Sequence, residues 1–219
     1  MDALTQEITK LFEQAVGLWL MGGWAMIPIA INALVMFALS VTVYLRLRET
    51  GFRSVREKTW RGWIDRPQER RGPVGELLDF AMGAQTLKDI EINFEEIRAT
   101  EIAPFQRDLR VVRICVAAAP LLGLLGTVTG ILATFDALSK GSGGEQTMGM
   151  IAAGISEALV TTETGLMIAI PGLFLQHVLS RNTERYRAFL AHLETVCTQT
   201  VYQRLKQRNR TADVSAGTR

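Results

Sequence analysis

Three long stretches of the chain are nearly free of charged side chains, and the charges are crowded between and after them. Residues 28–45 and 114–135 contain no Asp, Glu, Lys or Arg, and residues 148–176 are mostly apolar although they carry carboxylates. A helix of about 20 apolar residues is long enough to cross a bilayer. We therefore predict an all-α membrane protein with three transmembrane helices, and we favour it over a soluble helical bundle.

The placement of cationic residues predicts the orientation of these helices. Fourteen Lys and Arg residues lie between positions 46 and 113 and eight lie from position 181 onward, whereas Lys10 and Lys140 are the only others. Cationic residues mark the cytoplasmic side of membrane proteins. We expect the N-terminus and the 138–147 turn outside, and the 46–110 segment and the C-terminus in the cytoplasm.

The first residues have the spacing of an amphipathic helix. Leu4, Ile8, Leu11 and Phe12 share one face, and acidic and polar residues occupy the other. This pattern fits a helix on the outer membrane surface, bent at Gly22-Gly23. It also fits an extension of the first span. The segment has no basic region and no small-residue cleavage site, so we expect no cleaved signal peptide.

Gly and Pro divide the charged segment between the first two spans. Residues 49–75 contain several of these breakers and are expected to form turns, whereas a helical pattern resumes near Glu76 and could bend at Pro104. Long helices then extend the spans into the cytoplasm. The predicted segments are a periplasmic-side amphipathic helix (1–21), transmembrane helix 1 (22–45), a cytoplasmic helical domain (46–110), transmembrane helix 2 (111–137), a periplasmic turn (138–147), transmembrane helix 3 (148–178), and a cytoplasmic helix with a disordered tail (179–219).

Charge and cysteine content exclude several function classes. The formal net charge is only +2, and the basic segment also carries twelve acids, so it is not a nucleic-acid patch. Cys115 and Cys197 are expected to remain reduced. We find no nucleophile–base pair, metal cluster or phosphate loop, so we predict no enzyme activity, no cofactor and no metal site.

Small residues in the second span predict close helix packing. Gly126 and Gly130 are four residues apart, and Gly123 follows Ala119 by the same interval, a spacing that allows helix backbones to approach in lipid. We add Gly165 of the third span to these packing residues. Two hydroxyl groups in the second span, at positions 127 and 129, could serve an ion pathway or simply bond a carbonyl one turn earlier.

The third span carries polar groups on more than one face. At roughly 100° per residue, Thr161 and Thr164 share the face of Glu157, whereas Thr162 lies about 140° away and Glu163 about 120° away on the other side. Ionisable groups in a membrane helix face a bundle interior, a partner or water. We therefore regard these carboxylates as candidates for an ion pathway, and expect Glu163 to need a partner or a raised pKa.

Two motifs in these spans carry a family resemblance. The second-span segment PLLGLLGTVTGILATF (120–135) and the third-span segment GISEALVTTETGLMIAIPG (154–172) resemble the signatures of the MotA/TolQ/ExbB family. The three-span layout resembles the ExbB branch more than the four-span MotA branch. This resemblance implies a pentameric ring in the bacterial inner membrane, surrounding a dimer of an ExbD-like single-span protein. Proton flow would then drive a TonB-like transducer.

The resemblance also assigns residues to the ion pathway. It places Thr127 and Thr162 at the pore and makes Glu157 the family's third-span glutamate, whereas Glu163 departs from the small apolar residue more usual there. Other outcomes remain open: a TolQ-like or gliding-type motor with a different output, or a passive scaffold whose glutamates only hold helices together. Sodium could also replace the proton.

Overall fold

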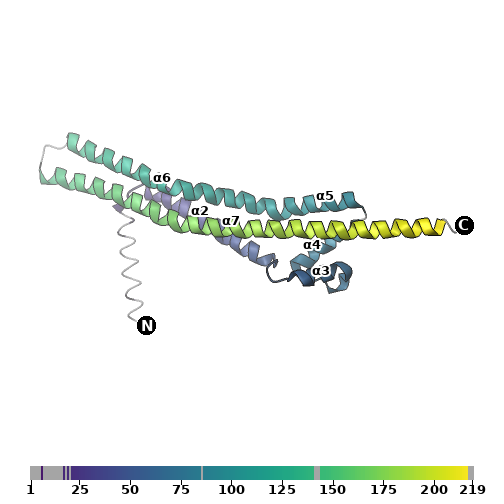
Figure 1. The fold of residues 1–219 in the computed structure, drawn as a ribbon. Helices are drawn as coiled ribbons and strands as arrows, with labels where there is room; N and C mark the ends of the chain where they lie inside the picture. The colour runs from purple at the N-terminus through teal and green to yellow at the C-terminus, as the bar shows by residue number, and fades with distance from the viewer. Residues whose placement is uncertain are drawn as a thin grey trace. The chain divides into compact units, whose positions relative to one another are not determined.

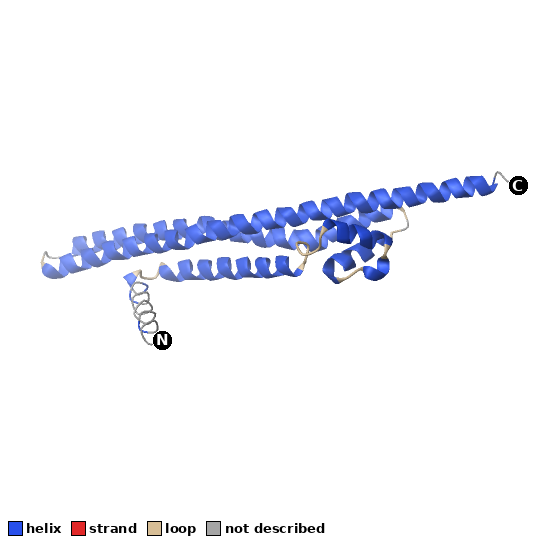
Figure 2. Ribbon diagram, turned by 60° about the horizontal axis from the view of Figure 1, so that its bottom comes forward, coloured by secondary structure: helices blue, strands red, loops and turns tan. Residues whose placement is uncertain are grey.

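The computed structural model describes residues 6, 17, 19, 21–84, 86–140 and 144–216. Most of the expected 1–21 helix and the centre of the 138–147 turn lie outside these residues. Within the described residues the chain is helical and contains no strand (Figure 2). Three helices are long and apolar enough to cross a membrane. The predictions of an all-α fold and of three spans are confirmed.

The three span-forming helices are α2 (Met26–Glu49), α6 (Ala103–Lys140) and α7 (Glu145–Ala216). Both α6 and α7 extend beyond the apolar stretches because charged amphipathic sequence continues the helical pattern before the apolar part of α6 and after that of α7. The helix α7 also continues through most of the tail that was expected to be disordered, since no Gly or Pro interrupts residues 173–216. Pro120 and Pro171 both remain inside continuous helix.

The chain divides into two compact units. One combines Met1–Ser40 with Arg110–His177 and is called here the membrane unit, because it holds most of the apolar stretches. The other combines Val41–Leu109 with Val178–Arg219 and is called the charged unit.

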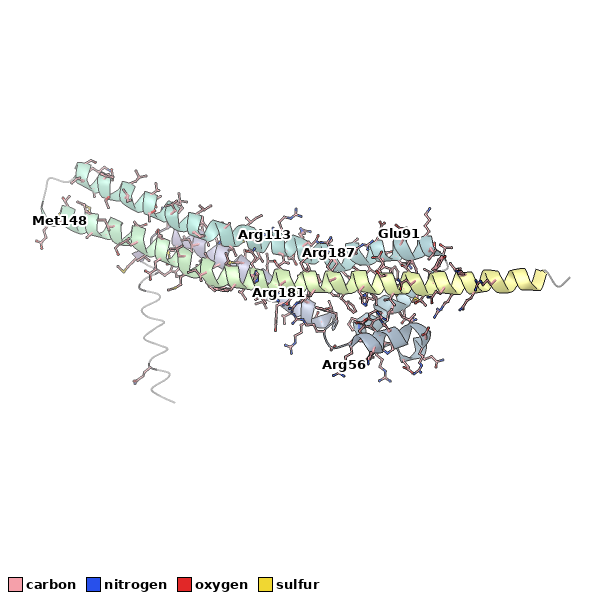
Figure 3. All side chains as sticks on the ribbon, in the orientation of Figure 1. Arg56, Glu91, Arg113, Met148, Arg181 and Arg187 are labelled. Atoms are coloured by element: carbon pink, nitrogen blue, oxygen red, sulfur yellow. The ribbon has the colours of Figure 1, made fainter. Side chains whose placement is uncertain are left out.

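The membrane unit is built on an antiparallel hairpin of α6 and α7, with α2 packed against it. Figures 1 and 2 show α6 and α7 side by side, and Figure 3 labels Arg113 on α6 and Met148 at the start of α7. A small core joins Met36 of α2 to Val112, Cys115 and Val116 of α6. The amide of Asn32 reinforces this contact by donating to the Cys115 carbonyl at 3.0 Å.

The charged unit adds three short helices to the ends of the long ones. They are α3 (Glu57–Asp65), α4 (Gly72–Met82) and α5 (Leu87–Ile97), and a capping box between Thr86 and Asp89 begins the last of them. Sequence analysis placed only turns in residues 49–75 and therefore missed α3. That helix forms because Trp60, Trp63 and Ile64 share one face and are all buried.

Two irregular helical turns complete the charged unit. A 3₁₀ turn, η1, spans Pro67–Glu69, and a π-helical turn, η2, spans Arg98–Ile102 between α5 and α6. The irregularity expected near Pro104 therefore takes the form of a π turn just before it. Such turns arise where one extra residue is inserted into the helical ladder.

Candidate functional site

Glycines form the seam between α6 and α7. Gly123, Gly126, Gly130 and Gly165 are all buried, and each approaches the opposite helix. A Cβ added at Gly165 would lie 2.7 Å from the Ala119 carbonyl oxygen. That distance is shorter than any ordinary contact, and the obstacle is backbone. The structure thus places all four predicted packing glycines where side chains would force the helices apart.

Thr162 links the two helices of the hairpin. Its hydroxyl donates to the carbonyl oxygen of Gly123 at 3.1 Å. Gly123 can be approached so closely because it has no side chain; a Cβ there would lie 3.1 Å from the Thr162 Cα. The packing glycines and one candidate pathway threonine therefore belong to the same contact.

Thr127 lies one helical turn beyond Gly123 on α6. Its hydroxyl donates to the Leu124 carbonyl at 2.6 Å, so it satisfies itself within its own helix. Thr129 does the same with the Leu125 and Gly126 carbonyls. Both residues are partly buried. The structure therefore shows each hydroxyl bonded to a carbonyl of its own helix, as the sequence analysis allowed. The lone pairs of the hydroxyl oxygens remain free to accept hydrogen bonds.

Glu157 lies on the side of α7 that faces the start of α2. A Cβ added at Gly23 would overlap the Glu157 carboxylate, and one added at Gly22 would lie 3.4 Å from Val160. Gly23 has φ of +61°, a left-handed conformation that glycine adopts without strain. Sequence analysis treated Gly22-Gly23 only as a bend and missed this contact. The paired glycines directly before an apolar helix were the available signal.

Glu163 points away from the helix contacts just described. It is exposed, and its neighbours one turn away, Leu159, Leu166 and Met167, are between 48% and 67% exposed. Among the described residues, no side chain forms a hydrogen bond or ion pair with its carboxylate. The partner expected for Glu163 is therefore not within the described part of this chain.

The structure brings together some of the candidate residues and separates others. Thr162 lies against Gly123, one helical turn from Thr127 on α6, whereas Glu157 faces α2 and Glu163 faces outward. Among the described residues, no three His, Cys, Asp or Glu side chains gather to hold a metal ion. The hairpin offers several threonine hydroxyls, Thr127 and Thr162 among them, that donate their protons to backbone carbonyls.

Comparison with known proteins gives a consistent result. Residues 76–191 match the MotA/TolQ/ExbB proton channel family. The protein named ExbB-like 1 of Synechocystis sp. is 40% identical over 142 residues, which cover 63% of this chain and 51% of that protein. The biopolymer transport protein exbB1 of Vibrio cholerae is 36% identical over 88 residues, covering 40% of this chain and 38% of its own.

The matched region contains the contacts between α6 and α7, but not the Gly22–Gly23 turn that Glu157 meets. The alignment to ExbB-like 1 spans about half of that relative, and the alignment to exbB1 spans less. The family match covers more than half of the present chain and includes all of α6 and α7 as far as residue 191, with the packing glycines and threonines. This chain is therefore an ExbB-like, multi-pass member of the MotA/TolQ/ExbB proton channel family.

Proposed function

We propose that this protein is the ring-forming subunit of a proton-driven motor in the bacterial inner membrane. Five copies surround a dimer of an ExbD-like single-span protein, and proton flow drives a TonB-like transducer that serves transport at the outer membrane. The N-terminus faces the periplasm and the C-terminus the cytoplasm. The observation that carries this proposal is the pairing of Thr162 with Gly123, one turn from Thr127.

The hydrogen bonds of these threonines favour a particular form of the transported proton. The proton of Thr162 is donated to Gly123 and that of Thr127 to Leu124, so each hydroxyl presents lone pairs to an incoming group. Lone pairs accept a hydrogen bond from a protonated carboxylic acid but repel a carboxylate. The pair is therefore suited to hold a neutral carboxyl group on a partner helix while it passes through the apolar layer.

The outward faces of the hairpin support assembly with other chains. Large apolar side chains there are well exposed, including Leu124, Val128 and Leu132 on α6 and Met167 and Ile170 on α7. Lipid covers such faces, but Glu163 lies among those of α7 and costs roughly 2.5–3.5 kcal/mol in hydrocarbon on insertion scales. We propose that a neighbouring copy covers Glu163, either by hydrogen bonding or as a second protonatable site.

Glu157 has a different proposed role. It contacts the Gly22–Gly23 turn and lies on the side of α7 away from Thr162, so it is suited to the seam at α2 rather than to direct contact with the partner carboxyl. If Glu157 takes part in proton passage, the Glu157→Gln variant still assembles into the complex, but that complex no longer drives the transducer. If the protein is a passive scaffold, the same change mainly reduces assembly.

The decisive experiment removes single hydroxyls from the purified complex. Thr127→Val and Thr162→Val keep side-chain volume, and Thr129→Val is the matched control because Thr129 also bonds its own helix but points roughly 160° from Thr127. We expect proton flux into liposomes to fall at least tenfold in the first two variants and to be unchanged in the third. Equal flux in all three would overturn the proposed pathway.

Two further measurements determine the subunit composition of the complex and the identity of the transported ion. Native mass spectrometry of the complex from native membranes should give five copies with two small single-span subunits, and the co-purified third protein identifies the driven system. A different transducer would favour the TolQ-like or gliding-type alternative. If the activity of the driven system persists without sodium but stops when a protonophore is added, the proton is the driving ion. Dependence of that activity on sodium would contradict this assignment.

A further inference from the structure

A cavity in the charged unit is separate from the ion pathway. It has a volume of about 510 Å³ and is formed by the last turns of α2, the turn that follows, and one residue of α7. Its polar lining consists of Tyr44, Arg48, Arg53, Ser54 and Asn182, and Phe52 contributes an aromatic wall. Neither the family match nor the proposed motor assigns this cavity a role.

The cavity is cationic. Arg48 and Arg53 line it, and no Asp or Glu does. Neither arginine forms an ion pair with any carboxylate in the described part of the chain, whereas the nearby Arg46 is 3.9 Å from Asp108. Two uncompensated guanidinium groups in one concave site attract an anion, and phosphate suits their planar, forked geometry.

Arg53 is held in place for such a ligand. Its guanidinium donates to the side-chain oxygen of Asn182 at 2.5 Å and lies 5.9 Å from the centre of the Phe52 ring. Asn182 is only 9% exposed, so this acceptor is anchored in the packed part of the unit. A guanidinium bound to a neutral amide keeps its full charge and has further N–H groups free for a ligand.

The position of the cavity along α2 indicates the source of the anion. The helix is long and apolar enough to cross a membrane, and the cavity begins at Tyr44 and Arg48 in its final turns. Tyrosine and arginine at the end of a spanning helix lie at the level of lipid headgroups. Basic pockets at the cytoplasmic ends of such helices bind anionic lipid headgroups.

We propose that this cavity binds the headgroup phosphate of an anionic phospholipid of the cytoplasmic leaflet. Arg48 and Arg53 form charge-assisted hydrogen bonds to the phosphate oxygens, and the Tyr44 hydroxyl lies at the polar edge of the cavity. The binding is reversible and non-covalent. It requires that α2 spans the membrane with its C-terminal end on the cytoplasmic side, the orientation proposed above, but it does not depend on whether the protein drives a motor.

The test uses the full-length protein with its co-purifying subunits, reconstituted in nanodiscs. One lipid mixture is phosphatidylcholine alone and the other contains phosphatidylglycerol, and retained lipid is read by native mass spectrometry. The variant Arg48→Gln/Arg53→Gln is compared with Arg56→Gln/Arg107→Gln. The control arginines are exposed, belong to the same unit and lie outside the cavity lining; Arg56 is labelled in Figure 3. Thermal denaturation confirms that each variant is folded.

We expect the wild type and the control variant to retain phosphatidylglycerol in preference to phosphatidylcholine. In the cavity variant this preference should fall roughly 30-fold, because both cations near the anionic surface are lost. Asn182→Ala, which keeps both cations but frees Arg53, should cause a smaller fall. Equal loss in the two double variants would mean general surface attraction and would overturn the proposal.

Two further measurements distinguish a lipid headgroup from free phosphate and from a protein partner as the ligand of the cavity. Inorganic phosphate at millimolar concentration is added to phosphatidylcholine nanodiscs, and retention of phosphate in place of lipid would overturn a headgroup site. The co-purified subunits are counted in every variant. Loss of a protein subunit from the cavity variant, with lipid retention unchanged, would show that the arginines bind a protein partner and would also overturn it.

Discussion

The two units of this protein are held together in opposite ways. In the charged unit, large side chains such as Trp60, Phe94 and Tyr186 are at most 1% exposed and form the core. In the membrane unit, the contact between α6 and α7 is made by glycines, alanines and threonines, and large side chains point outward; Leu124 is 56% and Met167 67% exposed.

The difference follows from the solvent each unit is built for. Water drives large apolar groups inward, at about 25 cal/mol per Å² buried. Lipid exerts no such force between helices, so close backbone packing and hydrogen bonds must hold them together. The ion pairs Arg98–Glu194 and Arg70–Asp79 join separate segments of the charged unit, whereas Lys140–Asp136 in the membrane unit lies within the single helix α6. The predictions below test this contrast.

The largest effect is expected from Trp60→Ala. Trp60 is 1% exposed and packs edge-on against Phe189 and His192, with ring centres 6.1 and 5.5 Å apart. Its removal leaves a cavity that should lower the free energy of unfolding of the charged unit by about 3–5 kcal/mol. Hydrogen exchange of α3 and the adjoining part of α7 in the full chain should accelerate accordingly.

Phe80→Ala is the control for this prediction, because Phe80 is 44% exposed in the neighbouring helix α4. The Phe80→Ala substitution should lower the free energy of unfolding by well under half as much as Trp60→Ala. If both substitutions destabilise the charged unit equally, burial of large side chains is not what holds it.

In the membrane unit, we expect damage from adding a side chain at a glycine rather than from removing a large one. Gly165→Val places a side chain against the Ala119 carbonyl, and the helices must separate to admit it. Overpacking of this kind costs about 1–3 kcal/mol and can abolish assembly. Size-exclusion chromatography after graded heating measures the loss of assembled complex.

Gly149→Val provides the comparison, since a Cβ at Gly149 meets nothing within 4 Å in this structure. That variant should assemble and melt like the wild type. Loss of assembly in both would mean that glycine content, rather than the α6–α7 seam, limits the membrane unit.

A smaller effect is expected from Tyr186→Phe in the charged unit. The Tyr186 hydroxyl donates to Glu101 at 3.0 Å, and burial together with this carboxylate raises the pKa of the phenol, so it remains a neutral donor. Losing one hydrogen bond to a charged group should cost about 1.5–3 kcal/mol, while the contacts of the ring with Phe52 and Phe105 persist.

Thermal denaturation of Tyr186→Phe is compared with Tyr202→Phe, whose ring is 54% exposed on the same helix. A melting temperature lowered only in the first variant supports the role of the bond to Glu101. If neither variant shifts, this buried polar contact contributes nothing net to the unit.

The smallest effect concerns pH. A hydrogen bond from His192 and the charge of Arg61 lower the pKa of the Glu57 carboxyl below its ordinary value of 4.5. The folded state therefore favours the charged form, and this stabilisation is present above pH 4.5 and is lost as the pH falls through the lowered folded pKa. Glu57 is fully exposed, so the change is slight.

The measurement is the difference in melting temperature between the wild type and Glu57→Gln from pH 6 down to pH 3. We expect the difference to shrink toward zero at the acid end. Glu91→Gln, at an exposed position labelled in Figure 3, should show no such trend. A difference that stays constant over this range would contradict the assigned interaction.

Several features could be predicted from the sequence because they depend on local pattern. Charge-free stretches indicated the three spans, and the glycine spacing of the second span indicated close packing. The helix α3 was missed because the Gly and Pro residues around it outweighed a short amphipathic face with two tryptophans. Short helices depend on tertiary burial more than on their own propensity.

The candidate site was only partly predictable. Helical angles correctly separated Thr162 from Glu157 on α7, since the rotation per residue is constant. The angles could not say which neighbour each face meets. That Thr162 bonds Gly123 and that Glu157 contacts Gly23 depends on how distant segments pair.

The sequence by itself therefore determined the number of spans, the all-α class and the family resemblance, because hydropathy and motif spacing are properties of the linear chain. Only the tertiary structure decided which hydroxyl crosses between helices, which carboxylate is covered and which faces outward, and where two arginines share a cavity. These properties depend on contacts between residues as far apart as Arg53 and Asn182, whose pairing no local pattern encodes.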